Sequence, residues 1–169
     1  YNNGLYNKLA QKGQLSQQEN FLILHRQNIV LEELYFFPPG YQVVIAPGTE
    51  IILRKAAGII SYSPLSLSGE VDNRITITGE AGAYGLVVLN VDQPSVIQNA
   101  DIQGLSAVNH RSWSLTGSIT FYESEVSISD STFRSTESED LLNIIRSNFK
   151  ITNSTFEDSA SDMVDIDFG

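Results

Sequence analysis

The chain of 169 residues contains no cysteine. Neither a disulfide framework nor a thiolate metal site can therefore form. No apolar run approaches the roughly 20 residues that a membrane helix needs, so we expect no membrane insertion. The sequence also shows no phosphate-binding glycine loop, no serine nucleophile elbow and no histidine-rich metal motif. Several of the common sequence signatures of an enzyme are thus missing.

Positive charge is scarce as well. Ten Lys and Arg residues face 20 Asp and Glu residues, which gives a formal net charge of -10 and an isoelectric point near 4.5. Nucleic acids and anionic lipid surfaces repel such a chain, so we expect no nucleic-acid partner. The length and the apolar fraction of 41% suffice for one domain with a sizeable core.

The C-terminal part of the chain contains a repeat of 23 residues. The segment VSISDSTF at residues 126–133 aligns with FKITNSTF at residues 149–156. Apolar and polar residues alternate in both, which predicts strands with one buried face. Three short strands in each 23-residue unit do not fit a repeating hairpin. They fit one coil of a parallel β-helix, in which every strand pairs with its copy one coil later.

Alternating segments continue upstream of this repeat and predict an all-β solenoid of about six coils. They are YQVVIAPGTEIIL, GIISYSPLSLSG, RITITGEAG, GLVVLNV and VIQNADIQG. We predict an N-terminal cap over residues 1–30, partly helical or irregular, and a single-stranded parallel β-helix over residues 31–169. The last coil begins at Asp162 and leaves a strand with nothing to cover it. We therefore expect the β-helix to be C-terminally incomplete.

Two runs carry a resemblance to known proteins. The run from GYQVVIAPGTEIIL to NRITITG resembles the opening coils of exported bacterial right-handed parallel β-helix proteins of the pectin-lyase-like superfamily. Residues 113–169, with DLLNIIRSNFKITNSTF and DMVDIDFG, are similar to the β-helix regions that accompany bacterial CotH-like proteins. The resemblance implies a right-handed β-helix and an extracellular, cell-surface or periplasmic location. It implies no single activity, because this fold hosts lyases, hydrolases, epimerases and non-catalytic domains.

Pectin-lyase-like relatives use aspartate clusters for calcium and an arginine or lysine as a base, but no complete set of these residues matches here. The alignment of the coils, with one residue fewer in the loop before Asp162, does predict three acidic or polar columns on the outer face. They are Thr120 with Asn143 and Asp165, Tyr122 with Ile145 and Asp167, and Asp140 with Asp162. Adjacent coils lie about 4.8 Å apart, so these side chains can share one patch.

The acidic patch suggests two chemistries and one simpler role. Oxygen ligands suit calcium, so Asp140, Asp162, Asp165 and Asp167 are predicted metal ligands, and the expected cofactor is either calcium or none. Asp165 and Asp167 are also candidate catalytic residues, because a glycosidase needs two carboxylates about 5–9.5 Å apart. The alternative is a solvated acidic face whose side chains satisfy turn backbone.

Residues 105–117, LSAVNHRSWSLTG, form an insertion with no counterpart in the later coils. Insertions in a solenoid become loops on one face, which is often the binding face. His110, Arg111 and Trp113 lie in this insertion, and two cations beside an indole suit an anionic sugar. Together with Asn143 they are the predicted substrate-binding residues. In the simpler interpretation Trp113 anchors the loop and the cations only decorate a turn.

These observations predict a non-catalytic β-helix domain of an exported or surface bacterial protein. Its expected role is to scaffold neighbouring domains of a longer chain, to bind polysaccharide, or both. The alternative is a polysaccharide lyase or glycoside hydrolase that uses the acidic patch. A lyase needs a base beside the uronate carboxylate. The last two coils offer only Arg146 and Lys150 at outward positions, so the sequence favours the non-catalytic role.

Overall fold

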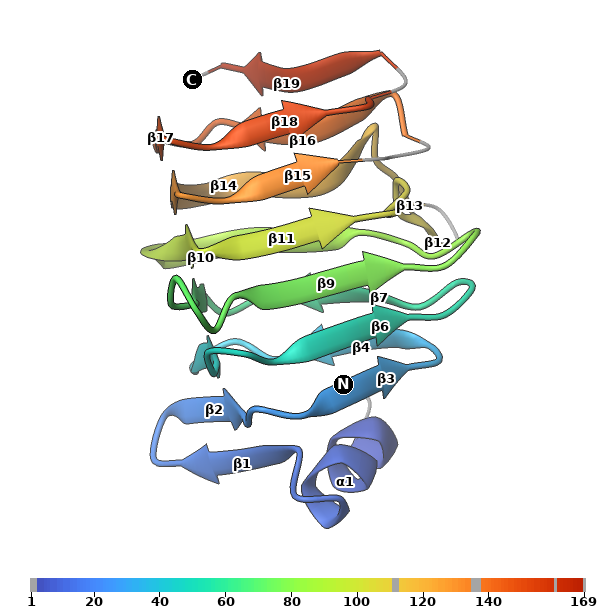
Figure 1. Ribbon diagram of the computed structural model, residues 1–169, viewed down its shortest axis with the longest axis vertical. Coiled ribbons are helices and arrows are strands. Elements are labelled where there is room, and N and C mark those ends of the chain that lie inside the picture. Colours follow the sequence, from blue (N-terminus) through green and yellow to red (C-terminus); the bar gives the residue numbers. More distant parts are fainter. Residues whose placement is uncertain (1–2, 111–112, 135–137, 160, 169) are drawn as a thin grey trace.

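The computed structural model describes residues 3–110, 113–134, 138–159 and 161–168. It confirms the predicted all-β solenoid, with 61% strand, 4% helix and about six turns of stacked parallel strands. In Figure 1 the front strands run from left to right, and the chain returns behind them while it climbs, so the coil is right-handed. The predicted period holds in the last coils, where Ser127 pairs with Lys150, 23 residues later.

Each coil contributes one strand segment to each of three parallel sheets, of which the first and third are continuous with each other through two long strands. The first sheet contains β2 (Phe21–Leu24), β5 (Gln42–Ile45), β8 (Leu65–Ser68), the second halves of β10 (Leu86–Gln98) and β14 (Gly117–Ser129), and β17 (Phe149–Thr152). The second sheet contains β3 (Asn28–Leu31), β6 (Glu50–Leu53), β9 (Ile75–Gly79), β11 (Ala100–Gln103), β15 (Thr132–Arg134) and β18 (Thr155–Glu157). The third sheet contains β4 (Leu34–Phe37), β7 (Gly58–Ser61), the first halves of β10 and β14, β16 (Asp140–Ile145) and β19 (Asp162–Asp167).

The N-terminal end of the solenoid is covered by α1 (Asn3–Gln11) and β1 (Leu15–Gln18). β1 pairs antiparallel with β2, and Leu9 and Leu15 are buried in the main core. β2 pairs in parallel with β5, and β3 pairs in parallel with β6. The parallel coils therefore begin at β2, ahead of the boundary at residue 31 that the sequence predicted. Among the described residues no helix is long and apolar enough to cross a membrane.

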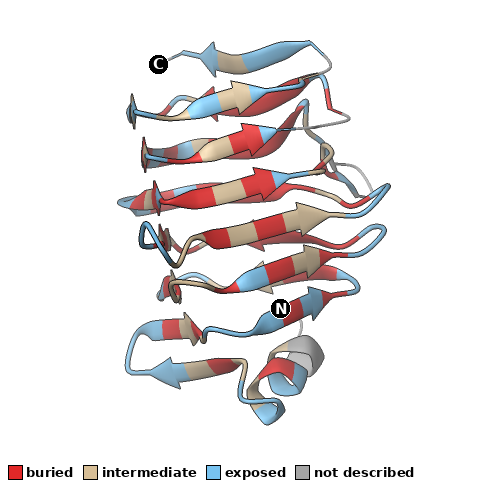
Figure 2. Ribbon diagram, viewed as in Figure 1, coloured by how far each residue is buried: buried red, intermediate tan, exposed pale blue. Residues whose placement is uncertain are grey.

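The core is a stack of inward-facing aliphatic and aromatic side chains. Figure 2 shows buried and more exposed residues alternating along the front strands, as the period of two requires. Phe121 and Phe133 are fully buried. Phe156 stacks on Phe133 with ring centroids 4.9 Å apart and planes 6° apart. Side chains at equivalent positions of successive coils therefore pack directly against one another.

The corner between the first and second sheets explains the repeated DST and NST sequences. Asp130 and Asn153 have φ of 51° and 47°, in the left-handed region that Asp and Asn tolerate best. The serine after each one accepts a backbone N–H from the coil before it. Ser131 Oγ accepts from Ala100 at 3.1 Å, and Ser154 Oγ accepts from Ser131 at 3.3 Å. This serine ladder pairs donors that a turning backbone leaves free.

The corner between the third and first sheets repeats the arrangement in the later coils. Glu123 and Arg146 have positive φ, and Ser124 and Ser147 follow them. Ser147 Oγ accepts the backbone N–H of Ser124 at 2.8 Å. Arg146 Nη1 lies 3.4 Å from Glu123 Oε1, so an ion pair also joins these adjacent coils.

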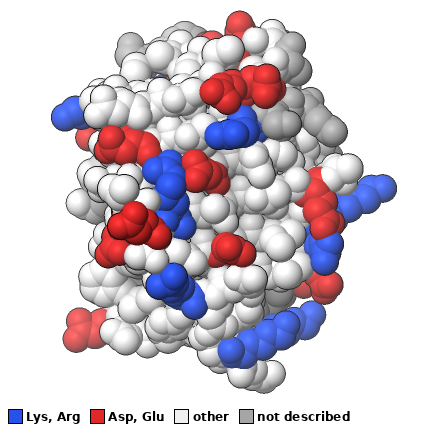
Figure 3. Space-filling view, in the orientation of Figure 1, with Lys and Arg blue, Asp and Glu red and all other residues white. Residues whose placement is uncertain are grey.

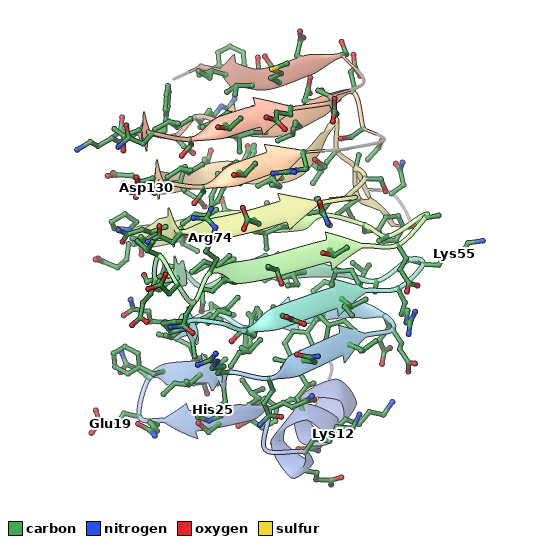
Figure 4. All side chains as sticks on the ribbon, in the orientation of Figure 1. Lys12, Glu19, His25, Lys55, Arg74 and Asp130 are labelled. Carbon is green, nitrogen blue, oxygen red and sulfur yellow. The ribbon has the colours of Figure 1, made fainter. Side chains whose placement is uncertain are left out.

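An arginine also ties successive coils together on the front of the molecule. The second sheet carries charges of both signs on its outer face (Figure 3). Arg74 donates to both carboxylate oxygens of Asp101, at 2.7 and 3.1 Å, and to the backbone carbonyl of Asp130 at 3.0 Å (Figure 4). The hydrogen bond from Arg74 holds the pKa of Asp101 below its ordinary value. Arg74 thus acts as a staple across the coils.

Candidate functional site

The structure aligns the acidic columns as the sequence predicted. Asn143 pairs with Thr120 on one side and with Asp165 on the other, in register. Asp140 pairs with Asp162 in the same two strands, β16 and β19. The residues of the predicted acidic patch therefore do stand on neighbouring coils of the third sheet.

The inner part of this patch is not an open face, however. Asn143 and Asp140 are only 2% and 4% exposed. The end of the insertion lies over them: Asn143 Nδ2 donates to Thr116 Oγ1 at 2.9 Å, and the Asp140 N–H donates to the Thr116 carbonyl at 3.3 Å. Within the described residues Asn143 Oδ1 has no hydrogen-bond partner. Asn143 thereby anchors the end of the insertion to β16, and its role in binding substrate stays a prediction.

The exposed part of the patch is on β19. Burial raises the pKa of Asp165, and the charges of Asp167, Asp140 and Asp162 raise it further. Yet the described residues include no group of three or more Asp, Glu or His side chains arranged to hold a metal ion. The calcium site therefore stays a prediction, and the structure does not gather its four aspartates as ligands.

The raised pKa of Asp165 predicts a pH-dependent cost. When a carboxyl binds its proton more tightly in the folded state than in the unfolded state, the protein's free energy of unfolding falls as the pH rises through the folded pKa. Asp165→Asn should therefore raise the melting temperature slightly at pH 7, because solvent screens most of the penalty, and leave it unchanged at pH 3. Asp72→Asn, at an exposed loop position, controls for the loss of one negative charge. Equal increases in melting temperature in both variants would show that ionised Asp165 has no specific destabilising effect.

Two of the predicted sugar-binding residues of the insertion, His110 and Trp113, lie on two short paired strands. β12 (Asn109–His110) and β13 (Trp113–Ser114) pair antiparallel, with His110 opposite Trp113. Arg111 lies outside the described residues, and the side chains of His110 and Trp113 are not described. Their role toward an anionic sugar stays a prediction.

The insertion does have one clear structural role. Val108 is fully buried on the outer face of the third sheet, in a cluster separate from the main core. This outer cluster consists of Leu34, Ile60, Val87, Leu89 and Val108. Leu115 packs against it, and Tyr84 Oη donates to the carbonyl of Asn109 at 2.6 Å. The insertion therefore covers apolar residues that point away from the solenoid core.

A groove that the sequence did not predict lies at the corner between the third and first sheets. Five residues, 38–42, turn this corner between paired positions of the first two coils, but only three, 62–64, turn it in the next step. In the following coil a bulge in β10, between Val91 and Ser95, lengthens the corner again. The short corner at 62–64 therefore forms the floor of the groove, and the two longer corners form its walls. Bulges often border functional sites.

This corner groove has a volume of about 480 Å³. Its lining residues are Asn20, Pro39, Gly40, Tyr41, Gln42, Tyr62, Pro64, Asn90, Val91, Asp92, Gln93 and Pro94. Both tyrosines are partly exposed and stand on adjacent coils. The groove therefore presents two rings, several amides and one carboxylate on a surface that turns around the solenoid.

The floor of the corner groove is held by hydrogen bonds. Ser63, which is fully buried, donates from Oγ to the Pro38 carbonyl at 2.6 Å and accepts the Tyr41 N–H at 3.2 Å. The Tyr62 N–H donates to the Phe37 carbonyl at 3.0 Å. The backbone that carries both tyrosines is therefore fixed before any ligand arrives, which lowers the entropy cost of binding.

The lining chemistry matches a sugar better than a purely apolar ligand. A tyrosine offers an apolar ring face with a polar tip, and the amides of Gln42, Asn90 and Gln93 both donate and accept hydrogen bonds. Sequence comparison of the coils conceals this site, because the extra corner residues fall into alignment gaps. The available signal was the pair of longer corners, FPPGYQ and NVDQPS, on either side of SYSP.

The chain matches no protein-family model, no curated protein and no solved structure. The fold therefore rests on the strand register alone. A β-helix by itself implies no activity, so the functional evidence in this protein comes from the corner groove and the acidic patch.

Proposed function

We propose that this chain is a non-catalytic β-helix module that binds polysaccharide in the corner groove. We place it in an exported or surface protein of a bacterium, related to the pectin-lyase-like β-helices and to those beside CotH-like proteins. Neighbouring domains of a longer chain are its other partners, with the solenoid as a rigid scaffold between them.

The observation that carries this proposal is the arrangement of Tyr41 and Tyr62. The two residues lie on adjacent coils, over a floor fixed by Ser63, and face a groove that also holds amide side chains. Rigid aromatic side chains dominate many binding sites because they contribute area at small entropy cost. In the acidic patch, by contrast, Asn143 is buried and donates a hydrogen bond to Thr116 of the insertion.

Calorimetric titration with soluble oligosaccharides tests the proposal. The wild-type protein should bind at least one member of a panel of uncharged and uronate oligosaccharides. Tyr62→Ala should weaken that binding tenfold or more, which corresponds to about 1.4 kcal/mol. Tyr122→Ala is the matched control. Tyr122, like Tyr62, packs against the outer cluster, but it does not line the groove. Binding by no member of the panel, or equal losses in both variants, would overturn the proposal.

A second function has one observation in its favour. Two neighbouring carboxylates of which one has a raised pKa are typical of a general acid beside a general base or nucleophile. Asp165 and Asp167 on β19 form such a pair, and the pKa of Asp165 is raised by burial and by its acidic neighbours. The corresponding enzyme is a glycoside hydrolase or lyase that acts at the exposed edge of the third sheet. New reducing or unsaturated ends that disappear in Asp167→Asn would establish it.

A further inference from the structure

We infer that the corner groove selects uncharged polysaccharide chains and rejects chains that carry carboxylate, sulfate or phosphate groups. This inference rests on the proposed function of the groove and names the ligand class. It differs from the anionic sugar that His110, Arg111 and Trp113 of the insertion suggested, because the described lining of the groove carries no positive charge.

The charge of the lining carries the first step. The described residues that line the groove include no Lys, Arg or His, and their one ionisable acid is Asp92. Glu19 precedes the lining residue Asn20 in the chain, and the whole protein has a net charge of -10. An anionic ligand would therefore meet negative charge without a compensating cation, which costs affinity and slows association.

The polar groups of the lining carry the second step. Asn20, Gln42, Asn90 and Gln93 have amide side chains, which donate and accept hydrogen bonds at one planar group. Sugar hydroxyl groups also donate and accept, so amides pair with them without any charge. Specific anion recognition uses guanidinium or ammonium groups or clustered backbone N–H groups. The described residues of the lining include neither guanidinium nor ammonium groups.

The shape of the groove carries the third step. The corners at 38–42 and at the β10 bulge stand on either side of the short corner at 62–64. Two coil spacings separate these walls, which is roughly 10 Å. One polysaccharide strand fits between them, with its sugar rings against Tyr41 and Tyr62. We therefore place the chain across the corner, perpendicular to the solenoid axis.

Asp92 makes the discrimination testable. It is exposed on the bulge, so Asp92→Asn removes the charge and keeps an oxygen that accepts hydrogen bonds. Like charges about 4 Å apart in water repel each other by about 1 kcal/mol, which corresponds to a factor of about five in affinity. We expect Asp92→Asn to strengthen binding of uronate oligosaccharides about fivefold and to leave binding of neutral ones within twofold. Asp72→Asn removes the same charge at a distant loop and should change neither.

The experiment uses the whole chain and titrates it with cello-, xylo- and manno-oligosaccharides and with oligogalacturonate and oligoalginate, at two salt concentrations. Binding of a neutral member at least tenfold tighter than of any uronate, with Asp92→Asn narrowing the gap, supports the inference. Uronate binding that equals or exceeds neutral binding overturns the inference but leaves polysaccharide binding in place. Binding of neither class removes the proposed function and the inference together.

Discussion

Replacing Gly85 with alanine is expected to destabilise the fold by more than about 4 kcal/mol, among the largest effects of any single substitution in this chain. A Cβ atom at this position would lie 1.6 Å from the backbone oxygen of Ser118 and 3.0 Å from that of Ser106. Both obstacles are backbone atoms, so no side chain can rotate away. The Gly85 carbonyl also accepts the Ile59 N–H at 3.0 Å, which fixes it to the preceding coil.

Gly13→Ala is the control for this substitution. Gly13 has φ of +66°, but nothing lies within 4 Å of its added Cβ atom. It should therefore cost only the left-handed strain, about 1–2 kcal/mol. Urea unfolding followed by circular dichroism separates the two effects. A loss at Gly85 no larger than the loss at Gly13 would show that adjacent coils can move apart, contrary to the tight packing of their backbones.

The 23-residue repeat predicted the fold and the register of the last coils because both depend on local rules. Alternation of period two decides which residues face inward, and stacking places equal positions on neighbouring coils. Asp140 over Asp162 and Asn143 over Asp165 follow directly. Corner serines such as Ser131 and Ser154 repeat for the same reason, since each one pairs a backbone donor of the preceding coil.

The repeat could not predict what covers an outward position. Thr120 and Asn143 stand in the same outward column as Ile60 and Val87, and all four residues are buried. Apolar residues at outward positions of the earlier coils were the available sign that another segment lies over them. The sequence interpretation treated the insertion as a binding loop. In the structure its described part packs on this column through Val108.

The corner groove escaped prediction for a different reason. It results from a difference in length between successive corners, at 38–42, at 62–64 and at the β10 bulge. The strands of successive coils are alike and reveal the repeat, whereas the corners differ and leave no repeating signal. Both tyrosines of the groove lie in such corner segments. Departures from the repeat, rather than the repeat, are therefore where function is best sought in this chain.

The covering role of the insertion leads to the second large effect. Val108→Asp should destabilise the protein by about 3 kcal/mol or more, because it places an unpaired charge in the fully buried outer cluster. We expect the insertion to lift off and expose Ile60, Val87 and Leu89. The inward-facing core does not include these residues, so most of the far-ultraviolet circular dichroism should remain while binding of an apolar dye increases.

The matched control is Asn109→Asp, which adds the same charge one residue later at an exposed position. It should leave both the melting temperature and dye binding close to the wild-type values. If Val108→Asp behaved like this control, the insertion would not hold the outer cluster and would be free to act as a binding loop. If instead Val108→Asp abolished all β structure, the outer cluster would be part of the folding core. We expect a partial loss of structure, between these two outcomes. The insertion covers the outer cluster, whereas the main core of the solenoid is a separate cluster.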